Sequence, residues 1–249
     1  MKPTEKNEVA WVCLRWGERY PWQYVSRLAA SLARNTTSSL PLYCLSDSAS
    51  LPKSVSDLGV RHRQCPNNWW GWWQKIHLFD REFWPFRHLI FIDLDVVIMS
   101  SIDSLITRRH QYDWIFAPDA IDQMSSSFMV IDLHSNLASD VRKGFDAKWV
   151  CPEDIDQDYL RKFVDAEKYR ILELPAEAHM SYKFFANIKD WRERATNPRY
   201  SGSSLDHTQM FNFHGFPKPL DLEADPERWP FSREILENWV NPHQIESLS

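Results

Sequence analysis

The chain has 249 residues, a formal net charge of −5 from 29 basic and 34 acidic side chains, and 13 tryptophans but only 6 glycines. This length suffices for one large α/β domain, and the acidic balance argues against nonspecific nucleic-acid binding. No two glycines lie two residues apart, which excludes the Rossmann and Walker A phosphate loops, and no apolar run reaches the roughly 18 residues of a membrane span.

The N-terminus and the cysteines indicate a cellular compartment. The first ten residues, MKPTEKNEVA, lack the apolar run of a signal peptide. The four cysteines lie far apart and form no CxxC pair: Cys13, Cys44, Cys65 and Cys151. They fit neither a zinc site nor a disulfide framework. We expect a reduced, cytoplasmic protein with cysteines as small core residues, without a transmembrane segment but compatible with peripheral membrane contact.

The N-terminal half alternates short apolar runs with amphipathic stretches. The apolar runs predict strands over residues 9–14, 40–45, 88–92, 113–117 and 128–133. The amphipathic stretches predict helices over 22–34 and 71–83, and in the second helix we expect Trp72, Ile76 and Phe79 to share one face. This alternation is typical of βαβ units with a mostly parallel sheet.

The pattern is weaker after about residue 150. We expect a helix over 156–164, strands over 169–174 and 210–214, and a C-terminal helix over 232–240 with Ser232 as its N-cap. Because the chain has no repeat, low-complexity segment or clear linker, we interpret residues 1–249 as a single domain.

Asp93 and Asp95 follow the most apolar of the predicted strands, residues 88–92. In an extended backbone their side chains would point to the same side, where two like charges repel. The carboxyl end of a central strand is also where open α/β sheets bind ligands. A divalent cation would remove the repulsion, and carboxylates suit Mg²⁺ or Mn²⁺. The alternative interpretation is a pair of solvated turn residues.

A second polar segment, HGFPKP at residues 214–219, ends another short apolar run. His214 is a candidate third ligand that would favour Mn²⁺ over Mg²⁺, and it is equally a candidate structural histidine. Gly215 permits a tight turn, and the two prolines restrict the backbone around Lys218. An ammonium fixed next to a metal in this way would bind a diphosphate.

Four segments in this order resemble those of glycosyltransferases with the GT-A fold, particularly retaining enzymes of glycosyltransferase family 8 and their bacterial relatives. They are GWWQK at 71–75, FIDLDVVI at 91–98, DQD at 156–158 and FHGFPKP at 213–219. The resemblance spans most of residues 9–219. It implies an α/β GT-A fold, a central mostly parallel sheet flanked by helices. The nucleotide-binding half would cover about 8–134, and the half that binds the acceptor and closes over the metal about 135–249.

The resemblance further implies a hexosyltransferase that moves a sugar from a nucleotide-diphosphate sugar, a UDP-sugar in our expectation, to a hydroxyl of a glycan or other acceptor. It assigns an Mn²⁺ (or Mg²⁺) ion, which would bridge the two donor phosphates, to three side chains: Asp93, Asp95 and His214. It assigns the donor nucleotide to residues in and near the first strand and near the metal: Trp16, Tyr20, Lys75, Asp93, Ser127, Gly215 and Lys218. Asp156 and Gln157 would contact the donor sugar beside its anomeric carbon.

Structural interpretations of the same side chains remain open, with Lys75 as a solvated helix charge and Asp156 as a helix N-cap. Phe128 stands where the family usually has a small residue, and it would narrow the sugar pocket. The segment between His214 and Lys218 is also shorter than in the best-known family members.

The implied mechanism uses the metal as a Lewis acid on the leaving nucleoside diphosphate, with Lys218 adding positive charge. For retention, the departing phosphate oxygen would take the acceptor proton on the same face of the sugar. Gln157 would then be a stabiliser, because an amide is a poor nucleophile. Asp156 and Asp158 are the alternative catalytic nucleophiles.

Two other functions remain open. A haloacid-dehalogenase-like phosphatase would use Asp93 as nucleophile and Asp95 as acid/base, but its DxD strand normally opens the fold, whereas here residues 1–87 precede that strand. A non-catalytic carbohydrate-binding protein would use a tryptophan-rich surface. Within residues 69–73 we expect Trp69 and Trp70 at a pocket rim and Trp72 in the core. Nucleic acid is not an expected partner, and the oligomeric state is not indicated.

Overall fold

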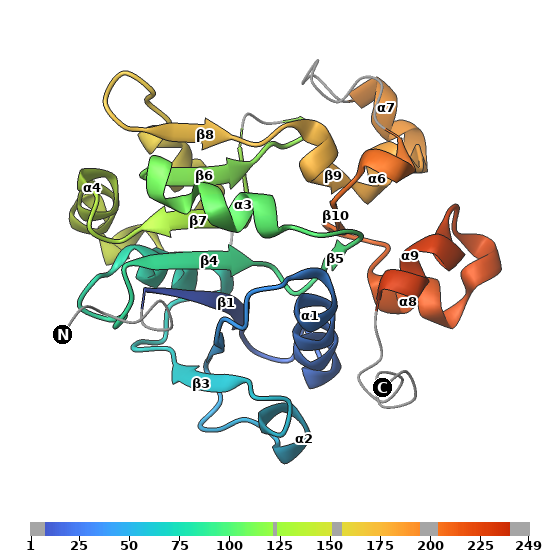
Figure 1. The fold of residues 1–249 in the computed structure, drawn as a ribbon, viewed down its shortest axis with the longest axis horizontal. Coiled ribbons are helices and arrows are strands. Elements are labelled where there is room, and N and C mark those ends of the chain that lie inside the picture. The colour runs from blue at the N-terminus through green and yellow to red at the C-terminus, as the bar shows by residue number, and fades with distance from the viewer. Residues whose placement is uncertain (1–7, 122–123, 151–155, 195–203, 240–249) are drawn as a thin grey trace.

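A central β-sheet carries helices on both faces (Figure 1). The structure, a computed structural model, describes residues 8–121, 124–150, 156–194 and 204–239. The sheet consists of β1 (Val9–Arg15), β2 (Leu42–Ser46), β3 (Arg61–Gln64), β4 (His88–Ile92), β6 (Trp114–Ala117), β7 (Ser125–Asp132) and β8 (Ile171–Glu173). Their order is β3-β2-β1-β4-β7-β6-β8, and of these seven strands only β7 runs antiparallel to the others. The predicted mostly parallel sheet is confirmed.

A second, smaller sheet lies beyond the carboxyl ends of the parallel strands, on the right of Figure 1. Its strands are β5 (Val96–Ile98), β10 (Met210–Asn212) and β9 (Met180–Ser181), in that order. Phe211 in the middle strand pairs with Val97 on one side and with Met180 on the other. This sheet therefore joins the C-terminal part of the chain to the segment that directly follows β4.

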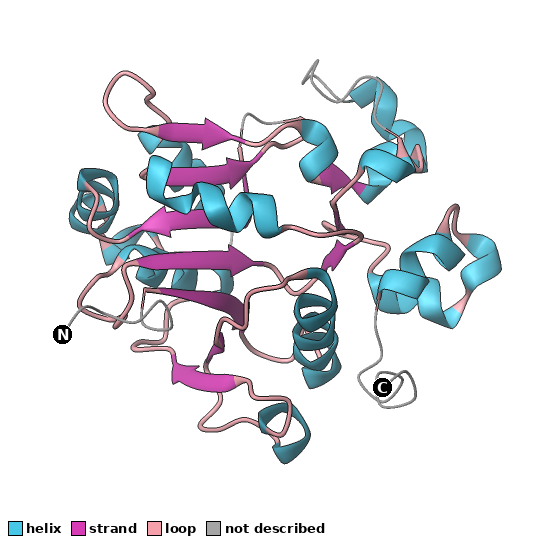
Figure 2. Cartoon of the chain, viewed as in Figure 1, coloured by secondary structure: helices cyan, strands magenta, loops and turns pink. Residues whose placement is uncertain are grey.

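Most helices are short, as Figure 2 shows. The α-helices are α1 (Trp22–Asn35), α2 (Lys53–Ser56), α3 (Asp103–Thr107), α4 (Asn136–Gly144), α5 (Asp156–Leu160), α6 (Tyr182–Phe185), α7 (Trp191–Arg194), α8 (Pro219–Ala224) and α9 (Ser232–Asn238). A 3₁₀ helix spans Gly71–Phe79, and several shorter 3₁₀ turns occur elsewhere. None of the helices in the described parts of the chain combines the length and the hydropathy that a membrane span requires.

Both faces of the sheet are covered by apolar side chains. Successive residues of β1 alternate between two hydrophobic clusters, with Trp11 in the cluster beneath α1 and Val12 in the cluster beneath the 3₁₀ helix and α4. Because side chains of a strand point alternately to opposite faces, a strand covered on both sides needs apolar residues throughout. This requirement explains why β1 and β4 read as continuous apolar runs in the sequence.

A buried arginine on α1 attaches the C-terminal helices to the N-terminal half. The Arg27 guanidinium donates to the Glu223 carboxylate, at 2.6 and 2.9 Å, and to the Trp239 carbonyl at 2.7 Å. Arg27 is only 5% exposed, so these bonds replace the water that its charge would otherwise bind. The segment from α8 to α9 is therefore docked against the first helix.

The segment 71–83 differs from the predicted amphipathic α-helix. Residues Gly71–Phe79 form a 3₁₀ helix with about three residues per turn, so residues three apart share a face. The face that enters the core is accordingly Trp73, Ile76 and Phe79, each at most 2% exposed. Trp72 belongs to another face, where it is partly buried and packs against the border of the core cluster.

Other differences are local. Arg61–Gln64 has no apolar pattern, so the edge strand β3 escaped prediction, and the predicted helix over 156–164 divides into α5 and a short 3₁₀ turn. Ser232 is the first residue of α9 and not its N-cap; Phe231 occupies the cap position, and the Ser232 hydroxyl donates to the Pro226 carbonyl.

The described cysteines are free thiols. Cys13 and Cys44 are buried neighbours on β1 and β2, and Cys65 is partly exposed. Cys151 lies outside the described residues.

Candidate active site

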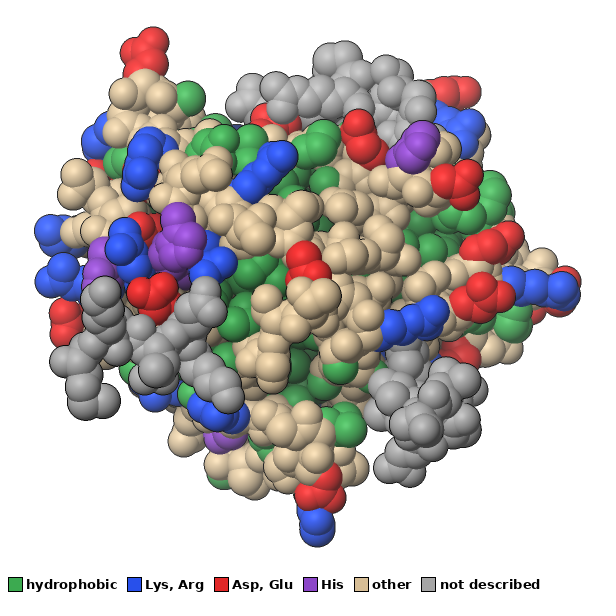
Figure 3. All heavy atoms as spheres, viewed as in Figure 1, with side chains coloured by type: hydrophobic (Ala, Val, Ile, Leu, Met, Phe, Trp, Pro, Cys, Tyr) green, Lys and Arg blue, Asp and Glu red, His purple; other side chains and the backbone are tan. Residues whose placement is uncertain are grey.

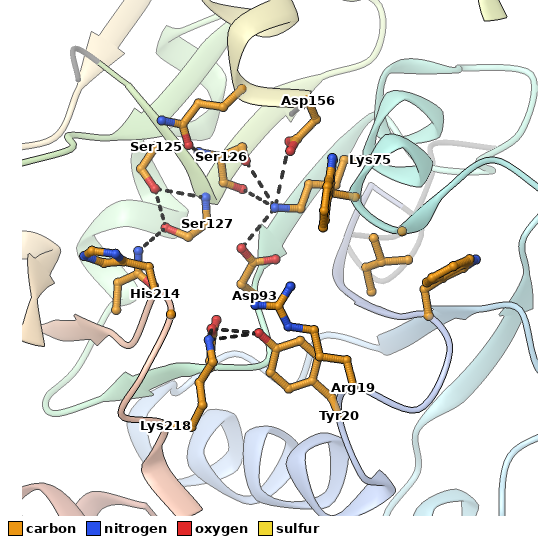
Figure 4. Close-up of a pocket in the computed structure, with 18 of the residues that line it drawn as sticks. Arg19, Tyr20, Lys75, Asp93, Ser125, Ser126, Ser127, Asp156, His214 and Lys218 are labelled. Carbon is orange, nitrogen blue, oxygen red and sulfur yellow. Dashed lines mark hydrogen bonds and ion pairs between the residues drawn. The ribbon is translucent and has the colours of Figure 1, made fainter. Parts of the chain in front are cut away.

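A pocket of about 730 Å³ opens at the carboxyl ends of β1 and β4, facing the small sheet. It is lined by most of the side chains that the sequence marked as functional: Trp16, Tyr20, Lys75, Asp93, Asp95, Ser127, Asp156, Gln157, His214, Gly215 and Lys218. Figure 4 draws 18 of the lining residues, ten of them labelled, which come from the two halves of the chain. Parallel sheets characteristically bind ligands at this edge.

Asp93 and Asp95 stand in a turn between β4 and β5. The Val96 amide donates to the Asp93 carbonyl at 3.2 Å, so the backbone is not extended here and the predicted reason for their shared direction is wrong. Both side chains nevertheless line the pocket. They are kept apart by separate partners, Lys75 for the first and Lys218 for the second.

Lys75 is a buried cation between two carboxylates (Figure 4). Its ammonium donates to Asp93 Oδ2 at 3.0 Å and to the Ser126 hydroxyl at 3.1 Å, and Asp156 Oδ2 lies 3.9 Å away. Burial by itself would lower the pKa of Lys75, but the charges of Asp156 and Asp93 outweigh it and raise the pKa. Burial also raises the pKa of Asp93, to about 6, against the opposing charge of Lys75. The interpretation of Lys75 as a solvated helix charge is wrong, because the residue is 5% exposed.

Lys218, Asp95 and Tyr20 form a second charged group. The Lys218 ammonium donates to the Asp95 carboxylate, and also to the Phe213 carbonyl at 2.7 Å; the Tyr20 hydroxyl donates to Asp95 Oδ2 at 2.8 Å. Burial would raise the pKa of Asp95, and the Lys218 ammonium together with these hydrogen bonds lowers it instead. Burial, followed by the charge of Asp95, raises the pKa of Tyr20, so its hydroxyl stays a donor.

The sequence KPLD explains how Lys218 is positioned. Pro219 is the first residue of α8, where its fixed φ suits a helix start, and the Asp221 carboxylate accepts a hydrogen bond from the Lys218 amide at 2.6 Å. The backbone of Lys218 is therefore held at a helix start while its side chain enters the pocket.

His214 faces the small sheet and α6. Its Nε2 lies 2.7 Å from the Ser181 hydroxyl, and the edge of its ring meets Trp191 at 5.0 Å between ring centroids. Burial and then the charge of Lys183 lower the pKa of His214, so the ring is neutral at pH 7. The next residue, Gly215, has φ +70°, and a Cβ there would lie 2.6 Å from Lys183 Nζ.

The geometry of the pocket bears on the predicted metal site. Within the described residues, no group of three His, Cys, Asp or Glu side chains is close enough together to hold a metal ion, so the predicted set of Asp93, Asp95 and His214 is not assembled. The two aspartates still fit a cation in part. No described residue donates to Oδ1 of either carboxylate, and Mg²⁺-type sites commonly combine one or two carboxylates with substrate phosphates.

The serines at the start of β7 form one wall. Ser125, Ser126 and Ser127 line the pocket, and the Ser126 amide donates to Gln157 Oε1 at 3.4 Å. Phe128 does not narrow the pocket as predicted. It is fully buried in the core cluster beneath α1, where it is paired with Ile92 of β4.

Helix geometry separates the predicted catalytic acids. Asp156 is 4% exposed and lines the pocket, whereas the Asp158 side chain is 60% exposed, pairs with Arg161 at 3.2 Å and is outside the lining. In an α-helix, residues two apart point about 200° apart, so both cannot face one site. Asp156 Oδ2 is buried and accepts no hydrogen bond from the described residues.

The tryptophans divide differently from the prediction. Trp16, Trp70 and Trp72 line the pocket, and the rings of Trp16 and Trp70 lie 4.7 Å apart. Trp69 is not among the lining residues; it is partly buried, packs against the core cluster beneath the 3₁₀ helix, and stacks its ring on that of His77 with 4.6 Å between the centroids. The rim position predicted for Trp70 is confirmed, since that residue is 41% exposed.

Sequence reasoning missed several lining residues: Glu18, Arg19, Asp119, Ser125 and Asn212. Only Asn212 carried a signal. It stands two residues before His214, and alternate residues of an extended segment share a face. Arg19 and Asp119 lie in loops without a pattern that could have distinguished them.

The chain is similar to known proteins in structure but not in sequence. No family model and no curated protein matches the sequence. Solved glycosyltransferases match the structure. WbbM, a bifunctional glycosyltransferase, has a TM-score of 0.64 at 13% identity over 99% of this chain and 52% of its own. GlyE of Streptococcus pneumoniae TIGR4 has a TM-score of 0.67 at 11% identity, over 96% of this chain and 62% of its own.

A third match covers a whole protein. LgtC, a galactosyltransferase solved with donor and acceptor sugar analogues, has a TM-score of 0.57 at 14% identity over 96% of this chain and 99% of its own. The chain thus spans about half of WbbM and less than two thirds of GlyE, but nearly all of LgtC. These similarities show that the chain has the predicted GT-A glycosyltransferase fold.

Proposed function

We propose that this chain is a glycosyltransferase that moves a sugar from a UDP-sugar to an acceptor hydroxyl, with retention of the anomeric configuration. The observation that carries the proposal is the pairing of the buried Lys75 and the partly buried Lys218 with two aspartates in one pocket at the carboxyl end of the sheet. No observation favours the phosphatase or the non-catalytic alternative.

The proposed position of the donor diphosphate is beside Lys218. The Lys218 ammonium donates to three oxygen atoms, those of Asp95, Tyr20 and the Phe213 carbonyl, so a donor phosphate oxygen would take the place of one of these acceptors. A positive charge fixed here would stabilise the negative charge that develops on the leaving group. The aromatic rings of Trp16 and Trp70 would receive the nucleobase at the other side of the pocket.

The proposed donor-sugar site lies between Lys75 and α5. The buried Asp156 Oδ2 has no hydrogen-bond donor among the described residues, and a sugar hydroxyl would satisfy it. The Gln157 amide, bound to the Ser126 backbone, would stabilise the sugar beside it. Because the charge of Asp156 is balanced by Lys75, we favour the route in which the departing phosphate oxygen takes the acceptor proton over the route in which Asp156 acts as nucleophile.

We also propose that a divalent cation, Mn²⁺ in our prediction, is held by Asp93 and Asp95 when the donor is bound. It would supply Lewis-acid polarisation of the leaving diphosphate. The remaining catalytic contribution of the chain is positioning of the acceptor hydroxyl against the anomeric carbon. The cytoplasmic location stays a prediction, as does the single-domain interpretation.

A thermal-shift screen tests the proposal. UDP, GDP and CDP are each added with and without Mn²⁺, and UDP near 100 times its dissociation constant should raise Tm by about 5–10 °C. The shift should require UDP and grow with Mn²⁺. Lys218→Met should remove most of it, and Lys143→Met, an exposed residue on α4, should not. Absence of a shift with all three nucleotides would refute the transferase.

A further inference from the structure

Three cations lie on consecutive short helical segments next to the pocket: Lys183 on α6, Lys189 on the 3₁₀ turn Ile188–Asp190 and Arg194 on α7, which together we call the basic strip. Lys183 stands at its inner end. Its ammonium lies 2.6 Å from the point where a Cβ on Gly215 would be, and Gly215 lines the pocket while Lys183 itself does not. The strip therefore begins at the edge of the candidate active site and continues outside it.

The basic strip has no acidic partner within the described residues. No carboxylate there forms an ion pair with Lys183, Lys189 or Arg194. Burial and then three positive charges, those of Lys218, Lys189 and Arg194, lower the pKa of Lys183. Residues 195–203 contain no acidic side chain either. Asp190 and Glu193 lie in the same segment, so residues 183–194 carry four basic and two acidic side chains in a protein of net charge −5. Acidic and basic side chains are interspersed on the face of the molecule that Figure 3 shows.

The backbone that carries the strip is strained. Asn187, Lys189 and Asp190 all have positive φ, at 50°, 52° and 58°. Asparagine and aspartate tolerate this left-handed region best, and lysine is not among the residues that adopt it readily. Strain of this kind concentrates at sites that bind ligands, where the surrounding structure enforces it.

Trp191 supplies an aromatic surface at the same place. Its ring lies 5.0 Å from the ring of His214, and the ammonium of Lys183 lies 5.5 Å from its centroid. Trp191 is only partly buried, so the residue keeps some exposure to solvent. Tryptophan faces suit the C–H surfaces of sugars.

We propose, on the premise of the proposed function, that the basic strip binds an anionic group of the acceptor, with the acceptor sugar on Trp191 and its carboxylate or phosphate at Lys183. Lys183 is then the residue that selects an acidic acceptor over a neutral one. We assign the strip to the acceptor and not to the donor because none of its three residues lines the pocket. Inside the pocket, Lys75 and Lys218 already supply positive charge. A carboxylate and a phosphate monoester present the same chemistry to an ammonium.

The test measures binding of matched sugars to the full chain in the presence of UDP, by saturation-transfer NMR titration. The probes are methyl hexosides of the gluco and galacto series, the corresponding methyl hexuronides and the corresponding 6-phosphates. They are titrated against the wild type, Lys183→Met, Lys183→Arg and the control Lys143→Met. Calorimetric titration of each variant with UDP runs in parallel, because it reports on the donor site alone.

We expect the wild type to bind an acidic probe about tenfold or more tightly than its neutral counterpart, the size of one charge-assisted contact. Lys183→Met should abolish that preference, Lys183→Arg should retain it, and UDP affinity should stay within about threefold. The uronide and 6-phosphate arms decide which acid is preferred.

Two results overturn the inference while leaving the proposed function in place: no preference for acidic probes, or a preference that survives in Lys183→Met. A loss of UDP affinity in Lys183→Met without an acceptor effect assigns Lys183 to the donor diphosphate and also overturns it. Absence of UDP binding by the wild type refutes the proposed function itself.

Discussion

Replacing Lys75 by methionine removes the cation that balances two carboxylates inside the protein. Lys75 is 5% exposed and Asp156 is 4% exposed, and the Asp93 side chain is 26% exposed. Methionine is of similar length and apolar, so Lys75→Met changes the charge more than the packing. The variant therefore isolates the electrostatic role of the residue.

Removing one partner of a buried ion pair typically costs about 3–5 kcal/mol, because the other charge is left without compensation. Partial solvation of Asp93 reduces its share, so we expect Lys75→Met to lower the free energy of unfolding by about 3 kcal/mol at pH 8. A protein of this size loses roughly 2–4 °C in Tm per kcal/mol, which predicts a fall of about 6–12 °C.

The loss should depend on pH. Burial raises the pKa of Asp93 to about 6 even with Lys75 present, and removal of the cation would raise it further. A group with a raised pKa in the folded state favours folding at low pH and loses that contribution as pH rises through the folded-state pKa. The deficit of Lys75→Met should therefore be largest at pH 8 and smaller at pH 5.

Urea unfolding at pH 8 and pH 5, followed by tryptophan fluorescence, measures both quantities. Lys143→Met is the matched control and should stay within about 0.5 kcal/mol of the wild type. The double variant Lys75→Met/Asp156→Asn should recover part of the loss, because one uncompensated charge is gone. A loss below about 1 kcal/mol at pH 8, or one of equal size at both pH values, would refute this account of Lys75.

Three further predictions concern the same pocket. Asp93→Asn should raise the free energy of unfolding by roughly 2–3 kcal/mol at pH 8 and by less at pH 5, and it should abolish transfer activity. Urea unfolding measures the gain, and a gain of equal size at both pH values would contradict the raised pKa of Asp93. Trp70→Ala should weaken UDP binding by about tenfold in calorimetry with little change in Tm, whereas Trp69→Ala should lower Tm and leave the affinity for UDP unchanged. The reverse pattern would show that Trp69, and not Trp70, contributes to the pocket. Gly215→Ala should cost about 1–3 kcal/mol in urea unfolding because of its positive φ and its closeness to Lys183, and a neutral result would show that the loop adjusts freely.

The sequence predicted elements best where the local pattern and the tertiary environment agree. The prediction for β4 matches residue by residue, and a strand covered on both faces must be apolar along its whole length. The prediction failed for β3, which is polar because it lies at the sheet edge, and for the face of Gly71–Phe79, where a period of three replaces 3.6. Neither an edge position nor a 3₁₀ period can be recognised from a short window of residues.

For the site, the sequence by itself indicated the edge of the sheet at which the pocket lies and about half of the residues that line it. Polar residues that follow apolar strands collect at one edge because parallel strands end there together. Only the tertiary structure decided which charges face each other. Lys75 and Asp93 are 18 positions apart and Lys218 and Asp95 are 123 apart, and no local periodicity relates residues at such separations. The place of Lys183 beside Gly215, without an ion pair to any described carboxylate, was decided in the same way, because folding determines which charges become neighbours.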